Sequence, residues 1–153
     1  MSMRKPLLLL AALASLSFSA MALAASTQLP TLLTVGDGNS FAVRPLTIGY
    51  TGDGTGVIGK LGPKRRGRWH WQSWTGSSAF GTGTVWLDDC VPDCARGTYH
   101  SHNGSVLANR VRNGHFTRMK IQFRFRGHTA TDIRRLDRLG SGYVWNIVSQ
   151  KGF

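Results

Sequence analysis

The 153-residue sequence contains no glutamate and only seven aspartates, against nineteen lysines and arginines, so its formal net charge is +12. Most of the aspartates stand beside glycine, proline or another aspartate, in turn-like contexts where a carboxylate accepts backbone hydrogen bonds. Asp88 and Asp89 would point to opposite faces of a strand, which does not suit paired-carboxylate glycoside chemistry. There is also no G-x-S-x-G nucleophile elbow. The sequence therefore disfavours an enzyme and predicts no cofactor.

Helical periodicity longer than about two turns is also missing beyond the N-terminal segment. Short apolar or alternating runs are separated by glycine, asparagine, aspartate and proline, a pattern typical of strands joined by turns. We expect an all-β fold: a single-domain antiparallel β-sandwich or barrel of about eight short strands. The expected strands are 41–50, 56–61, 68–75, 83–87, 97–102, 105–111, 116–126 and 143–148. Only TATDIRRLDRLG (129–140) is predicted as a helical turn or a loop.

Two Asn-Gly pairs predict the local connections. Asn103-Gly104 and Asn113-Gly114 each stand between alternating runs, and both residue types tolerate the positive φ of a type I′ turn. The three runs around these pairs are therefore expected to form an antiparallel meander.

The N-terminus has the features of a signal peptide. Arg4 and Lys5 precede an uncharged apolar stretch, which ends in a small-x-small pattern with a cleavage site near Ala24 or Ala25. The alternative is a membrane anchor, since the stretch approaches membrane-spanning length. We assign 1–25 to the signal peptide, 26–40 to a linker and 41–153 to the β-rich domain. No second apolar segment is long enough to span a membrane, so the predicted location is secreted or associated with the cell envelope.

Cysteine occurs only twice, at Cys90 and Cys94. An even count in an exported chain indicates a disulfide. So short a loop contributes only about 2 kcal/mol by chain entropy, which predicts a local role in fixing the turn. Metal binding is the alternative, although two cysteines at this spacing lack the ligand pattern of a zinc site.

A basic stripe follows the strand predicted over 116–126. Met119, Ile121, Phe123 and Phe125 alternate with polar residues, so one face is expected in the core and the other in water. The predicted polyanion-binding residues are Arg118, Lys120, Arg124 and Arg126, with Arg110 and Arg112 on the neighbouring strand. The same charges could instead form a solvated face that discourages strand-to-strand aggregation.

Two further groups of residues are weaker candidates. Trp69, Trp71 and Trp74 follow a basic segment and could stack on a ligand, although core packing is the favoured role for such large aromatic residues in a small β-domain. His100 and His102 share a face if their segment is extended and could present two imidazoles to one metal.

The stretch WQSWTGSSAFGTGTVWLDDCVPDCARGTY (71–99) resembles a family of small, uncharacterised exported proteins of actinobacteria, with a W-x-x-W, A-x-G-x-G-T, D-C-x-P-x-C-A-x-G-T signature. The signature falls on Trp71, Trp74, Ala79, Gly81, Gly83, Thr84, Asp89, Cys90, Cys94, Ala95, Gly97 and Thr98. The resemblance implies secretion, a β-rich fold and a paired-cysteine loop, but no activity. The segment from Lys64 to Arg68 and the basic C-terminal third depart from the family.

These observations lead to two functional hypotheses. The first is a secreted basic binding or structural module whose partner is a polyanion: a cell-wall polymer, an acidic polysaccharide or a nucleic acid. The second is an exported hydrolase or metal-dependent enzyme that uses His100 and His102.

Overall fold

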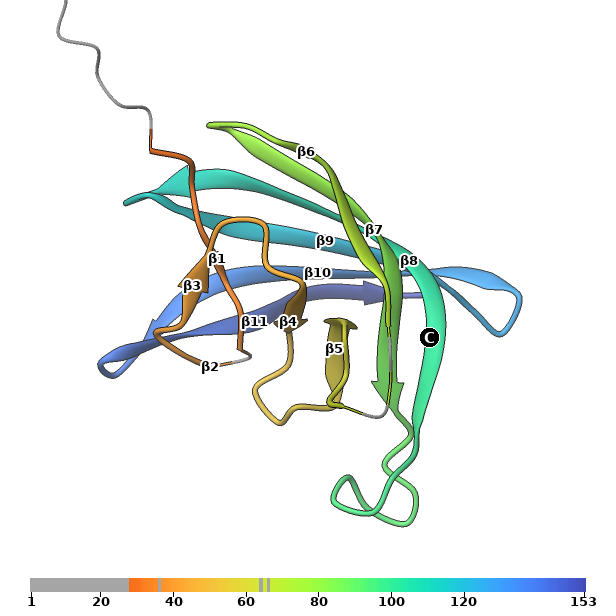
Figure 1. The fold of residues 1–153 in the computed structure, drawn as a ribbon. Coiled ribbons are helices and arrows are strands. Elements are labelled where there is room, and N and C mark those ends of the chain that lie inside the picture. The colour runs from red at the N-terminus through yellow and green to blue at the C-terminus, as the bar shows by residue number, and fades with distance from the viewer. Residues whose placement is uncertain (1–27, 36, 64, 66) are drawn as a thin grey trace, which may run out of the picture.

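The computed structural model describes residues 28–153 except 36, 64 and 66, so the predicted signal peptide lies outside the described residues (Figure 1). Within the described part the protein is all-β, as predicted: it has no helix, and its strands pair antiparallel. The strands are β1 (Leu32–Leu33), β2 (Asp37–Gly38), β3 (Phe41–Ala42), β4 (Thr47–Gly49), β5 (Gly56–Gly59), β6 (Trp69–Trp74), β7 (Ser78–Asp88), β8 (Tyr99–Arg112), β9 (His115–Phe125), β10 (His128–Leu139) and β11 (Gly142–Lys151).

One large sheet dominates the fold. Its strand order is β2-β11-β10-β9-β8-β7-β5-β4, with β6 paired to β7, while β1 and β3 form a separate small sheet. Figure 1 shows β7 to β11 following one another around a strongly curled sheet, with the short β4 and β5 on its concave side. No helix in the described part is long and apolar enough to cross a membrane.

The segment predicted as a linker contributes to this structure. Residues 26–40 include β1 and β2, and Leu32 and Leu33 are fully buried in the core. β1 pairs with β3, so the second half of the segment belongs to the folded domain.

Only one of the two Asn-Gly pairs forms a turn. Asn113 and Gly114 take positive φ values of 50° and 76° and connect β8 to β9, as predicted. The prediction of a turn at Asn103-Gly104 is wrong, because both residues lie inside the continuous strand β8. A Cβ at position 104 would lie 2.6 Å from Val85 Cγ2 and 2.7 Å from the Gln122 carbonyl oxygen. This glycine therefore allows close packing between strands and does not form a turn.

The helical turn predicted over 129–140 is also wrong, because these residues form most of β10. Ala130, Asp132, Arg134 and Leu136 alternate on its buried face. Two of these four inward side chains are charged and neutralise each other, which conceals the hydrophobic alternation typical of a strand.

The core lies on the concave face. Met119, Ile121 and Phe123 of β9 point into it, which confirms the predicted alternation. Ile48 of β4 and Ile58 of β5 are fully buried in the same core cluster. The outer face of β9 therefore carries Arg118, Lys120, Gln122 and Arg124.

Candidate anion-binding face and disulfide loop

Three predicted cations share the outer face of β9. Arg118, Lys120 and Arg124 alternate with the buried residues of the same strand and so point away from the core. Arg118 stands between Asn109 of β8 and Arg135 of β10 in the strand register. Side chains two residues apart on a strand are spaced by about 6.7 Å, so these cations form a row in which Gln122 separates Lys120 from Arg124.

The other predicted cations lie at the ends of this row. Arg126 belongs to the turn between β9 and β10 and not to the strand, and its φ is 48°. Its guanidinium carbon lies 5.1 Å from the centre of the Phe125 ring. At the opposite end, Arg112 is the last residue of β8.

Arg110 has an unusual backbone conformation for its position. It lies within β8 with a φ of 58°, in the left-handed region that costs an L-residue about 1–2 kcal/mol. The Thr117 hydroxyl donates to the Arg110 carbonyl oxygen over 2.5 Å. Such strain in a strand is often found at functional sites.

A surface depression of about 470 Å³ gathers arginines from three strands. Its charged lining is Arg110 and Arg112 of β8, Arg118 of β9, and Arg135 and Asp137 of β10. The sequence interpretation missed Arg135 and Asp137 because their segment was not assigned to a strand. We call Arg110, Arg112, Arg118, Lys120, Arg124 and Arg135 the outer basic face.

Asp137, which also lines the depression, is already engaged. Arg135 donates to both its carboxylate oxygens over 2.8 and 3.1 Å, and Asn146 donates to it over 2.9 Å. These hydrogen bonds, that from Arg135 first, hold the pKa of Asp137 below its ordinary value. Among the described residues, no acid forms an ion pair with Arg110, Arg112, Arg118 or Lys120. The face therefore carries a strong positive excess.

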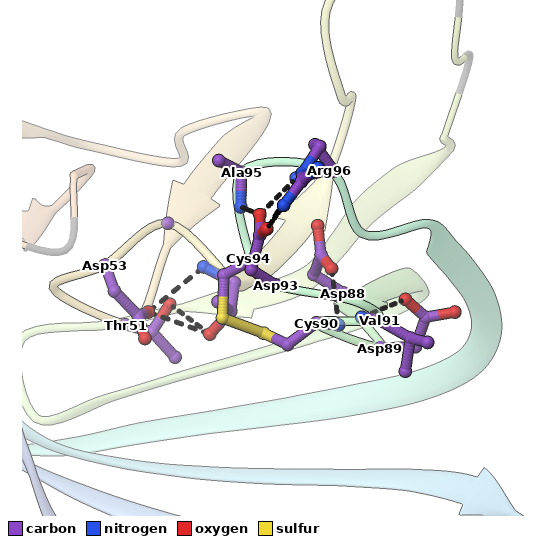
Figure 2. The surroundings of a disulfide bond; sticks show 12 residues. Thr51, Asp53, Asp88, Asp89, Cys90, Val91, Asp93, Cys94, Ala95 and Arg96 are labelled. Carbon is purple, nitrogen blue, oxygen red and sulfur yellow. Dashed lines mark hydrogen bonds and ion pairs between the residues drawn. A yellow bond between two sulfur atoms is a disulfide. The ribbon is translucent and has the colours of Figure 1, made fainter.

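The paired cysteines form a disulfide, as predicted, in the loop between β7 and β8 (Figure 2). Aspartates fix the backbone on both sides of it: Asp88 accepts from the Cys90 amide over 2.8 Å, and Asp93 accepts from the Ala95 and Arg96 amides. A Cβ at position 97 would lie 1.8 Å from Asp88 Oδ1, so this glycine makes room for the carboxylate.

Asp89 connects this loop to β8. It accepts from the Val91 and Thr98 amides over 3.1 and 2.8 Å and contacts His100 Nε2 at 3.0 Å. These interactions, led by the Thr98 amide and then His100, lower the pKa of Asp89 to about 2. The carboxylates of this loop thus act as backbone acceptors, in the role expected of turn aspartates.

The two candidate metal ligands have separate partners. His100 contacts Asp89, whereas His102 Nδ1 lies 2.9 Å from the Arg124 carbonyl oxygen. His102 packs near Phe123 and Phe125 on the inner face. No group of three histidine, cysteine or acidic side chains arranged to hold a metal occurs among the residues described.

The three tryptophans of β6 pack against one another and the core. The register shift after Trp71 makes Gln72 an extra residue, which brings Trp74 to the side occupied by Trp69 and Trp71. Trp69 and Trp74 are buried, and the Trp71 and Trp74 indoles donate to the Pro45 and Pro30 carbonyl oxygens over 2.8 and 2.9 Å. Only Trp71 keeps substantial accessible surface of the three.

Comparison with protein-family models, with curated proteins and with solved structures finds no match to this chain. The resemblance to exported actinobacterial proteins therefore stays a prediction.

Proposed function

We propose that the protein is an exported binding module whose outer basic face binds an extended polyanion. The convergence of Arg110, Arg112, Arg118 and Arg135 on one depression is the observation that carries this proposal. Four arginines brought together from three strands exceed what solubility requires, and the one acid among them is already hydrogen-bonded to Arg135 and Asn146.

The cations of β9 continue along the strand from the depression, so the proposed binding site is linear. Arg118 and Lys120 lie two residues apart and Arg124 lies four residues further along the same face, an arrangement that suits an extended chain with one negative charge per monomer. Binding would gain free energy from the release of counterions condensed on the polyanion, so its affinity should fall steeply with salt.

The test is a binding titration of the protein expressed from the full-length sequence. The probes are polyuridylate, a sulfated polysaccharide, a glycerol-phosphate polymer and inorganic polyphosphate, each across a salt series from about 50 to 200 mM. The panel distinguishes a nucleic acid from a polysaccharide and a wall polymer.

Two matched variants separate location from net charge. The face variant carries Arg112→Gln, Arg118→Gln and Lys120→Gln, and the control carries Arg44→Gln, Lys60→Gln and Arg68→Gln. All three control side chains are exposed and lie outside the outer basic face. For a single-stranded polyanion, the face variant should reduce the slope of log affinity against log salt by about 2, whereas the control keeps it. Equal losses in both variants, or no binding to any probe, would refute the proposal.

A further inference from the structure

A second hollow lies on the inner side of the sheet, away from the outer basic face. Its volume is about 720 Å³, within the usual range for small-molecule sites. The turn between β4 and β5 forms one wall, while β10 and β11 form the other. These elements belong to opposite ends of the sheet order, so the hollow lies where the curled sheet approaches closure. We call it the inner hollow.

The inner hollow contains a hydrogen-bond donor without a partner. Tyr50 is 1% exposed, and its hydroxyl has no hydrogen-bond partner among the described residues. A buried hydroxyl in this state costs a protein about 1–3 kcal/mol. Burial, and next the Asp132 carboxylate, raise the pKa of Tyr50, so the phenol keeps its proton and can donate.

Arg134 supplies further donors beside this hydroxyl. It is 5% exposed, and its guanidinium carbon lies 5.4 Å from the centre of the Tyr50 ring. Its Nε and Nη2 donate to Asp132 over 2.8 and 2.6 Å. A guanidinium has five N–H groups, so these two bonds leave donors for a ligand.

The charges in the inner hollow select a neutral ligand. Asp132 compensates Arg134, and its oxygens already accept from Arg134 and from Gln150. Asp53, at the exposed edge of the lining, accepts from the Thr55 amide and hydroxyl, and its charge is screened by water. Neither carboxylate therefore holds a cationic ligand strongly, while an anionic ligand would be repelled by both. The remaining walls are mostly apolar, with Leu87, Val144, Trp145, Ile147 and Phe153.

We propose that the inner hollow binds a small neutral organic molecule whose carbonyl oxygen accepts hydrogen bonds from Tyr50 and Arg134. The apolar body of such a molecule packs against Trp145 and Phe153. This site is independent of the polyanion proposal, since it uses the opposite face of the sheet.

Three probes of nearly equal size test the ligand class: benzamide, benzoate and benzylamine. Each is titrated into ¹⁵N-labelled protein expressed from the full-length sequence, and amide and indole shifts are followed by NMR. Benzamide should shift resonances around Tyr50, Trp145 and Asn146 and bind at least fivefold more tightly than the two charged probes. Benzoate or benzylamine binding as tightly as benzamide would overturn the ligand class, and the absence of shifts at these residues would overturn the site.

A variant then tests the role of the hydroxyl. Tyr50→Phe keeps the buried ring and removes only the donor, so benzamide affinity should fall about fivefold to tenfold. Tyr143→Phe is the control, because Tyr143 packs against Phe41 and does not line the inner hollow. This variant also loses a hydroxyl, but its affinity for benzamide should be unchanged. Unchanged affinity in Tyr50→Phe, or equal losses in both variants, would contradict the proposal.

Discussion

Strand β10 carries two Arg–Asp pairs, one on each face of the sheet, and their surroundings differ sharply. The side chains of Arg134 and Asp132 are 6% and 1% exposed on the inner face, whereas those of Arg135 and Asp137 are 66% and 29% exposed on the outer face. The inner pair is almost completely removed from solvent, and the Asp132 carboxylate accepts two hydrogen bonds from Arg134 and one from Gln150. The outer pair lies in water beside Arg110, Arg112 and Arg118, which form no ion pair with any acid in the described part of the chain. Similar residues thus contribute to core structure on one face and to a candidate binding surface on the other.

Substitution of the two aspartates should show the largest difference between these faces. Asp132→Asn leaves the Arg134 charge buried without compensation and should lower the free energy of unfolding by about 3–5 kcal/mol. Asp137→Asn is the matched control and should cost less than about 1 kcal/mol, because exposed pairs contribute little. Urea denaturation measures both, and equal effects would show that the two pairs do not differ in this way.

The strained arginine of the outer face allows a second comparison. Arg110→Gly relieves the left-handed strain and should raise the free energy of unfolding by about 1 kcal/mol, while it weakens polyanion binding. Arg112→Gly, at the end of the same strand, should instead lower stability by about 0.5–1 kcal/mol. A loss of stability in Arg110→Gly would show that its conformation is not strained.

For the inner hollow, we expect a substitution to raise the free energy of unfolding by a similar or smaller amount. Tyr50→Phe removes a buried hydroxyl that has no partner, so stability in the absence of ligand should rise by up to about 1 kcal/mol. Thermal denaturation of both proteins in ligand-free buffer measures this difference. A loss of more than about 1 kcal/mol would indicate that the hydroxyl is already hydrogen-bonded in the free protein.

The smallest expected effect concerns pH and lies in the disulfide loop. The folded-state pKa of Asp89, about 2, is below the ordinary value near 4. Its carboxylate therefore contributes stability above about pH 4, and this contribution is lost as the pH falls toward 2. The melting temperature of Asp89→Asn should approach that of the natural protein over this range. A constant difference between them would contradict the assignment.

The sequence predicts a residue's place in the structure where neighbouring residues determine it, and fails where packing against distant residues determines it. The alternation on β9 correctly places Arg118, Lys120 and Arg124 opposite the core, because period-two burial is a local signal. The two Asn-Gly pairs are locally equivalent, and only packing against Val85 and Gln122 makes Gly104 part of a strand.

Other features depend on residues distant in the chain. The glycines of the segment 71–99 illustrate this: a Cβ at Gly81 would lie 2.8 Å from Trp71 and 2.9 Å from Trp69, so this position is fixed by the tryptophans of β6. The inner hollow joins Tyr50 to Asp132 and Arg134, and no local pattern in the sequence indicates that they meet. Arg135 lies beside Arg118 only because residues 128–139 form a strand that pairs with β9.

The most direct test of the outer basic face is NMR mapping of inorganic polyphosphate on the ¹⁵N-labelled protein. We expect shifts at Arg112, Arg118, Lys120 and Arg124 that weaken with added salt, while the resonances of Tyr50 and the Trp145 indole remain unchanged. Shifts of equal size across all exposed cations, or shifts centred on Arg44, Lys60 and Arg68, would contradict it.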